Sequence, residues 1–255
     1  MQYKLIDGSR NDLNQIRDTV LENRGIDIKK YTHLNDSVLN SYSLFPNIYL
    51  AVDIFLKHCQ SNNHIHIIVD SDVDGYTSGA VMYQYIENIS PQCKLTYSLH
   101  SGKQHGLTDD ELVIPIDTDL LIIPDAGSND VKPCMMLKAE RPNLDILILD
   151  HHEIEEENPF ATVVNNQITE YPNKQLSGVG VVYKFLQAVD DTLWQYEANK
   201  YLDLVALGNI ADMMDIRDFE TRHLVVKGLQ QIRNPFFKEM VKVQNYSINR
   251  AGGLC

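Results

Sequence analysis

Short apolar runs alternate with segments of helical periodicity from residue 47 onward. Short runs of four to six residues predict strands at 65–70, 94–99, 119–124, 144–149 and 162–165. Apolar residues at helical spacing predict helices at 47–59, 77–88, 129–139, 179–189, 195–209 and 219–232. This alternation is typical of an α/β fold, in which a mostly parallel sheet carries helices on both faces.

The first 45 residues have a different character. They are polar, and Leu13, Ile16, Val20 and Leu21 recur at helical spacing. We therefore expect a helical N-terminal extension over residues 1–45, followed by the α/β domain over residues 46–245.

Composition narrows the class of protein. The chain of 255 residues is 44% hydrophobic, and no apolar run is long enough to cross a bilayer. Its first residues lack the hydrophobic region of a signal peptide, and its four cysteines form no CxxC pair. These features predict a cytoplasmic protein with reduced thiols and no membrane partner.

The charge of the chain bears on nucleic-acid binding. The formal net charge is −13, which argues against a broad basic surface for phosphate groups. A local basic groove would suffice for an enzyme that cuts nucleic acid, and the site carboxylates account for part of the excess negative charge.

Acidic clusters follow several of the apolar runs. They comprise Asp70, Asp72 and Asp74 in the segment DSDVDG, then Asp125, then Asp150-His151-His152, and finally Asp212. The carboxyl ends of parallel strands meet at one edge of a sheet, where open α/β sheets bind their ligands. Carboxylates and an imidazole gathered there predict a site for one or two divalent cations, Mn²⁺ or Mg²⁺.

The first of these clusters also has a simpler interpretation. A lone DxDxDG segment is most often a solvated turn, and an EF-hand loop would need a glutamate where the chain has Val81. If the first strand stayed extended, Asp70, Asp72 and Asp74 would share one face and would repel one another without a cation. The recurrence of acidic clusters in order favours the metal site.

These motifs, in this order, resemble those of the DHH phosphoesterase superfamily. Within it the chain is most similar to the RecJ family of single-strand-specific 5′→3′ DNA exonucleases. The alternating aspartates before Gly75, the pair Gly106-Leu107 and the segment 203–229 carry this closer resemblance. Ile68 stands where several other superfamily members have a histidine ligand, which disfavours a pyrophosphatase.

The resemblance implies a role for each site residue. Two divalent cations, with Mn²⁺ preferred and Mg²⁺ as the alternative, would be held by Asp70, Asp72, Asp74, Asp125, His151 and Asp212, with Asp125 between the two. Asp150 and His152 would be catalytic, because Asp150 supports His151 and His152 faces the substrate phosphate. The glycine-containing helix start at Ser177, Gly178 and Gly180, together with His105, would bind a substrate phosphate.

The implied activity is metal-dependent hydrolysis of phosphodiester bonds at an end of single-stranded DNA, in DNA repair or recombination. Two alternatives stay open: a phosphodiesterase for short oligonucleotides or cyclic dinucleotides, and a non-catalytic partner in replication or recombination. Residues 246–255 resemble the start of the connector to the second RecJ domain, which the sequence lacks. We therefore expect a separate second-domain polypeptide, or a replication or recombination protein, as a partner.

Overall fold

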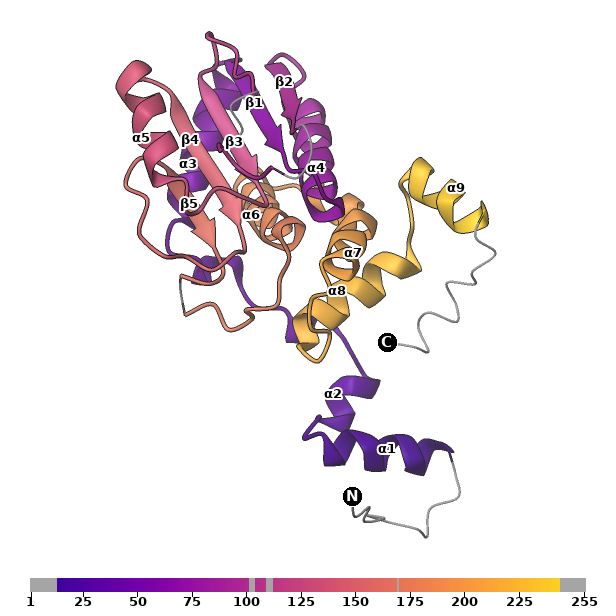
Figure 1. Cartoon of the computed structure of the whole chain (residues 1–255). Helices are drawn as coiled ribbons and strands as arrows, with labels where there is room; N and C mark the ends of the chain where they lie inside the picture. Colours follow the sequence, from indigo (N-terminus) through magenta and orange to yellow (C-terminus); the bar gives the residue numbers. More distant parts are fainter. Residues whose placement is uncertain (1–12, 101–103, 109–111, 169, 244–255) are drawn as a thin grey trace.

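The computed structural model describes residues 13–100, 104–108, 112–168 and 170–243. Its strands form one all-parallel sheet in the order β2-β1-β3-β4-β5 (Figure 1). The strands are β1 (His64–Val69), β2 (Lys94–Leu99), β3 (Leu120–Pro124), β4 (Asp145–Asp150) and β5 (Thr162–Asn165). The predicted class and all five predicted strands are confirmed, with bounds shifted by at most one residue.

The α-helices are α1 (Leu13–Asn23), α2 (Ile28–Thr32), α3 (Ile48–Gln60), α4 (Val73–Ile89), α5 (Val131–Glu140), α6 (Gly178–Leu193), α7 (Leu202–Ala211), α8 (Phe219–Gln230) and α9 (Pro235–Val243). Helices α3 to α6 cover the strands, and the remaining helices lie further from the sheet (Figure 1). Short 3-10 helices are η1 (Asp36–Val38), η2 (Tyr42–Leu44) and η3 (Ala198–Tyr201). The predicted helix over 195–209 is therefore in part wrong, because a turn and η3 precede α7.

Both faces of the sheet are buried. Ile67 of β1 belongs to the larger core, which includes Phe55 of α3 and Phe185 of α6. The next residue, Ile68, points to the other face and belongs to the core that contains Cys134 of α5. Burial on both faces explains why aliphatic residues occupy consecutive positions of the central strands, such as Ile67 and Ile68, rather than alternate ones.

The segment after β1 does not stay extended. Helix α4 begins at Val73, and its first turn is capped by Asp72, whose side chain accepts a hydrogen bond from the amide of Gly75. A Cβ on Gly75 would lie only 2.7 Å from the carbonyl oxygen of Asp70, so glycine permits this close approach. The condition for the three aspartates to share one strand face is therefore not met, because Asp74 lies on the helix.

The N-terminal extension is helical, as predicted. Leu13 is 82% exposed whereas Leu21 is buried, and α1 and α2 lie outside the two layers that flank the sheet (Figure 1). Phe45 is buried and stacks on Tyr171 with the ring centroids 4.2 Å apart, so the residues just before α3 pack into the domain. The boundaries at residues 45 and 245 stay predictions, and residues 246–255 lie outside the described residues.

Within the described part of the chain, no helix combines the length and the hydrophobicity that crossing a bilayer requires.

Candidate metal centre

The strand order brings the acidic clusters together. The sheet reverses its order between β1 and β3, and a crevice forms at such a reversal, outside the carboxyl ends of the strands. Asp70 follows β1 and Asp125 follows β3, so they flank this crevice. His151 comes directly after β4, the neighbour of β3, and Asp212 ends α7.

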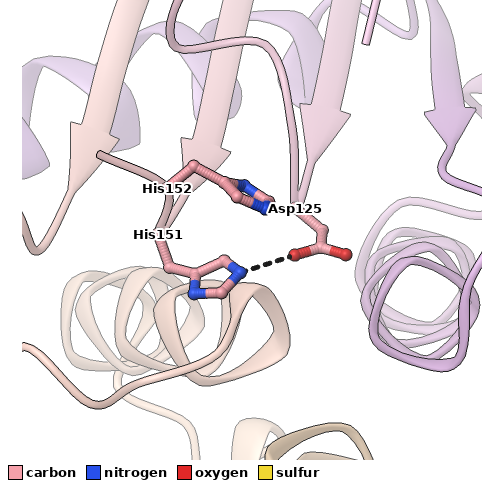
Figure 2. A group of neighbouring side chains, drawn as sticks. All are labelled: Asp125, His151 and His152. Carbon is pink, nitrogen blue, oxygen red and sulfur yellow. Dashed lines mark ion pairs between the residues drawn. The ribbon is translucent and has the colours of Figure 1, made fainter. Parts of the chain in front are cut away.

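Three carboxylates converge on one nitrogen atom of His151. The Nε2 atom lies 3.3 Å from Asp125 Oδ1, 3.5 Å from Asp212 Oδ2 and 3.9 Å from Asp74 Oδ2. Figure 2 shows the ring of His151 turned toward Asp125. Ligands held about 2.1 Å from one ion are themselves about 3.0–3.5 Å apart, so most of this spacing suits a shared cation.

A second group of carboxylates lies beside the first. Oxygen atoms of Asp70, Asp72 and Asp125 can all lie within 4.8 Å of one another. Asp125 thus faces both this group and His151. Its backbone has a φ of 71°, a left-handed conformation that aspartate tolerates better than most residues, and this directs the residue away from the line of β3.

Burial makes these carboxylates costly to ionise. It raises the pKa values of Asp74 and Asp212, and it raises that of Asp125 well above the ordinary value, with the charge of Asp74 adding to the effect. Asp125 Oδ1 and Asp212 Oδ2 are buried and accept no hydrogen bond from any described residue. A divalent cation would compensate both oxygen atoms, so the residues present fit a metal centre.

The start of helix α6 holds one of these carboxylates. The amide of Gly178 donates to Asp74 Oδ2 (2.5 Å) and that of Val179 to Asp74 Oδ1 (3.2 Å). The positive end of the helix dipole therefore faces a protein carboxylate. The phosphate-binding role of Ser177, Gly178 and Gly180 stays a prediction.

Two glycines allow the helices to approach the carboxylates. A Cβ on Gly178 would lie 2.1 Å from Asp125 Oδ1, and one on Gly208 would lie 2.3 Å from Asp74 Oδ1. Any side chain at either position would displace a residue of the metal centre. Gly208 was not predicted as a site residue, because its importance arises from contact between distant segments.

Asp150 organises the segment that follows β4. Its Oδ1 accepts the amide of His151 (2.7 Å) and pairs with His152 Nδ1 (2.8 Å), while its Oδ2 accepts the amide of Ser128 (3.0 Å). Burial alone would raise the pKa of Asp150, but the hydrogen bonds from His152 and Ser128 outweigh it and lower the pKa.

His152 is the cationic partner in this arrangement. The hydrogen bond to Asp150 raises the pKa of His152 to about 9, so the ring is protonated at neutral pH. Its side chain is 55% exposed and lies beside His151, with the ring centroids 4.4 Å apart (Figure 2). A positive charge is thus held at the mouth of the acidic centre, while the catalytic roles of Asp150 and His152 stay predictions.

His105 reaches the centre from the loop after β2. Its Nδ1 lies 2.6 Å from Asp70 Oδ2. Asp130 fixes this loop, because its Oδ2 accepts the amide of Leu107 and the loop turns at Gly106 with a φ of 60°. Asp130 was missed by the sequence analysis, although its position just before helix α5 is typical of a capping residue.

A buried asparagine was also missed. Asn165 ends β5, and its side-chain amide donates to the hydroxyl of Ser128 and to the carbonyl of His152, both at 2.9 Å. It therefore ties the turn after β3 to the segment after β4. A polar residue at the end of an apolar strand was the available signal.

Comparison with known proteins defines the class. Residues 64–209 match the N-terminal domain of the DHH family, and the chain belongs to that family. This range contains the first five metal-centre residues, from Asp70 to His151, and it ends three residues before Asp212.

Among curated proteins, the chain is similar to YorK of Bacillus subtilis (strain 168), whose name describes an SPbeta prophage-derived single-strand DNA-specific exonuclease. The two are 41% identical over 97% of this chain and 42% of YorK. The single-stranded-DNA-specific exonuclease RecJ of the same organism is 27% identical over 91% of this chain and 30% of its own length. The chain thus spans less than half the length of these relatives.

Solved structures show the same fold. RecJ from Thermus thermophilus in complex with Mn²⁺ aligns with a TM-score of 0.71 at 20% identity, over 89% of this chain and 33% of that one. A manganese-bound exonuclease RecJ aligns with a TM-score of 0.69 at 21% identity, over 83% and 54% of the two chains.

Proposed function

We propose that this chain hydrolyses phosphodiester bonds at an end of single-stranded DNA, using two divalent cations. Mn²⁺ is the preferred ion and Mg²⁺ the alternative. The observation that carries the proposal is the convergence of Asp74, Asp125 and Asp212 on His151 Nε2. The names of the relatives YorK and RecJ and the Mn²⁺-bound RecJ structures support the choice of substrate and metal.

The six predicted ligands divide into two sets. One cation would be held by Asp74, Asp125, His151 and Asp212, and the other by Asp70 and Asp72 with Asp125 shared. When bound, such cations lower the pKa of a coordinated water molecule and stabilise negative charge on the phosphoryl oxygen atoms.

The protein itself would position the substrate phosphate. A cavity of about 290 Å³ beside the carboxylates is lined by His105, Gly127, Ser128 and His152, among others. Protonated His152, oriented by Asp150, can donate a hydrogen bond to a non-bridging phosphate oxygen. His105 lies across the same cavity, and we propose that it makes a second phosphate contact.

We also propose that this region works together with further protein sequence, in the same polypeptide or in a separate one. The relatives YorK and RecJ are more than twice as long as the matched region. The net charge of −13 opposes a long polyanion, so basic contacts elsewhere would help to hold the strand. Degradation by this chain alone should therefore be distributive and sensitive to salt.

The test is an end-labelled nuclease assay in Mn²⁺. Single strands labelled at the 5′ or the 3′ end, the corresponding duplex, a linear dinucleotide and a cyclic dinucleotide are compared. We expect mononucleotides to be released from the 5′ end of the single strand, and His151→Ala to release none. Preferential cleavage of either dinucleotide would favour the small-substrate alternative, and no cleavage of any diester would contradict the proposal.

A further inference from the structure

An apolar groove lies between helix α4 and strand β2, outside the metal centre. Its volume is about 250 Å³, and its walls include Val69, Tyr76, Gly79, Tyr83, Tyr97 and Leu99. The residues that line it, all within the described part of the chain, include no Asp, Glu, Lys or Arg. Tyr76, Tyr97 and Leu99 are each about half exposed.

The groove exists because small residues face large ones. A Cβ on Gly79 would lie 2.7 Å from Val69 Cγ2, so α4 rests directly on β1 at this point. Gly79 and the neighbouring Ala80 leave open the space next to Tyr97 and Leu99. Strand β2 is at an edge of the described sheet, and no further described strand covers its outer side.

Two residues that line the groove are close in the chain to residues of the metal centre, although none of the proposed ligands lines the groove itself. Val69 precedes Asp70 in the chain and pairs with Leu99 across the sheet. Tyr76 follows Asp74 by two residues, in the first turns of α4. From Tyr76 to Tyr83 the helix rises about 10 Å, so the lining tyrosines of α4 span about that length of the helix.

The lining suits flat aromatic ligands. Three tyrosines surround the cavity, and the rings of Tyr83 and Tyr97 meet edge to face, with centroids 5.8 Å apart and an interplanar angle of 88°. Such a pair fixes the ring of Tyr97 while its side chain stays 57% exposed. Nucleobases stack on exposed aromatic rings of this kind whatever their sequence.

We infer that this groove is a nucleobase subsite, in which bases of a single strand stack on Tyr97 and Tyr76 while a backbone phosphate of that strand occupies the metal centre. The inference rests on the proposed function, because it concerns the same substrate. One or two stacked bases suit a cavity of this volume. In a chain with net charge −13, stacking supplies affinity that does not depend on attraction to phosphates.

The test is a binding cycle that pairs tyrosine variants with missing bases. All variants also carry Asp125→Asn, so that the DNA is not cleaved in Mn²⁺. Fluorescence anisotropy gives the Kd for a single strand of about twelve bases, roughly the length that one single-strand-binding module covers. Tyr97→Ala and Tyr76→Ala are compared with Tyr97→Phe, which keeps the ring. Tyr49→Ala is the matched control, because Tyr49 is as exposed as Tyr97 but lies on α3.

We expect Tyr97→Ala to raise the Kd about tenfold, and Tyr97→Phe and Tyr49→Ala to change it less than about twofold. The ratio of the Kd of Tyr97→Ala to the Kd of the parent should be the same at low and at moderate salt. Single abasic substitutions along the strand should weaken binding at one or two positions in the parent, and this loss should vanish in Tyr97→Ala. Such coupling between one base and one ring is not expected from a general structural defect.

An unchanged Kd in Tyr97→Ala would overturn the inference. So would a loss that is equal at every abasic position, or one that appears only when a second polypeptide is added. The nuclease assay on the chain without the Asp125 substitution separates the two proposals. Cleavage of DNA without base coupling refutes the subsite alone, whereas base coupling without cleavage leaves the subsite and refutes the hydrolysis.

Discussion

Replacing Gly208 by alanine should damage the metal centre without changing any ligand. Gly208 lies inside α7, and a Cβ there would be 2.3 Å from Asp74 Oδ1, 2.5 Å from Val179 Cγ1 and 2.7 Å from Thr77 Oγ1. Non-bonded atoms of these types normally approach to about 3.5 Å. The helix must therefore move by about 1 Å, or Asp74 must leave its hydrogen bond to Val179.

Two opposing effects set the size of the change. In a helix interior, alanine is favoured over glycine by about 1 kcal/mol. Overpacking costs about 1–3 kcal/mol of folding stability. Because the three contacts with Gly208 come from two other helices, we expect a cost near the upper end of this range. We expect a net loss of about 1–2 kcal/mol, which for a protein of this size lowers the Tm by about 2–8 °C.

Metal binding should suffer more than stability. The new Cβ displaces Asp74 directly, and Asp212 moves together with α7. The affinity for Mn²⁺ should therefore fall about 10- to 100-fold. Scanning calorimetry in EDTA gives the Tm, and titration calorimetry gives the Mn²⁺ affinity. The matched control is Gly180→Ala, whose Cβ would lie 3.2 Å from Leu176 Cβ and Cδ2 and 3.5 Å from Asn209 Nδ2. Because neither neighbour is a proposed ligand, the Mn²⁺ affinity should stay near that of the parent.

The result that would refute this reasoning is a Gly208→Ala protein with a Tm at or above that of the parent and an unchanged Mn²⁺ affinity. Helix propensity would then dominate, and the close packing of α7 on Asp74 would not hold the centre together.

Three further predictions concern the ligands and their titration. Asp125→Asn and His151→Ala should each abolish Mn²⁺-dependent hydrolysis and leave the circular dichroism spectrum unchanged. Asp125→Asn should also raise the Tm in EDTA at pH 7. Burial raises the pKa of Asp125, so its ionised form opposes folding at any pH above the ordinary aspartate range. Mn²⁺ should raise the Tm at neutral pH, and the rise should shrink on acidification as protons compete for His151 and the carboxylates; a Tm indifferent to Mn²⁺ would contradict the metal centre. Because the pKa of His152 is raised to about 9, its pairing with Asp150 stabilises the fold fully below about pH 6.5 and is lost as the pH rises through 9. His152→Gln should thus lower the Tm in EDTA clearly at pH 6 and little at pH 9.5, and an equal loss at both values would exclude the ion pair.

Much of the fold could be predicted because the central strands are buried on both faces. Their apolar runs were unmistakable, and a parallel sheet brings their carboxyl ends to one edge, so the grouping of Asp70, Asp125 and His151 followed from the strand positions. The path of the chain after β1 could not be predicted. Asp72 can extend the strand or cap a helix, and the choice depends on how closely Gly75 packs against Asp70.

The roles of residues that act through contacts between distant segments could not be predicted from the sequence. Asp130 carries no motif, and its role arises because the loop at Leu107 returns to the turn after β3. Gly208 is an ordinary helical glycine until α7 is placed against α4 and α6. Resemblance to a known family supplied the ligand order and their roles, but contacts of this kind depend on the packed structure.

The distribution of the ligands along the chain has a consequence for biosynthesis. Asp70 leaves the ribosome long before Asp212, which ends α7 near the close of the domain. A nascent chain that has completed only β1, β3 and β4 lacks one of the three carboxylates that face His151. If the centre binds a metal ion as proposed, the full set of ligands forms only after α7 has docked, and the binding energy would stabilise the finished domain rather than a partly synthesised one.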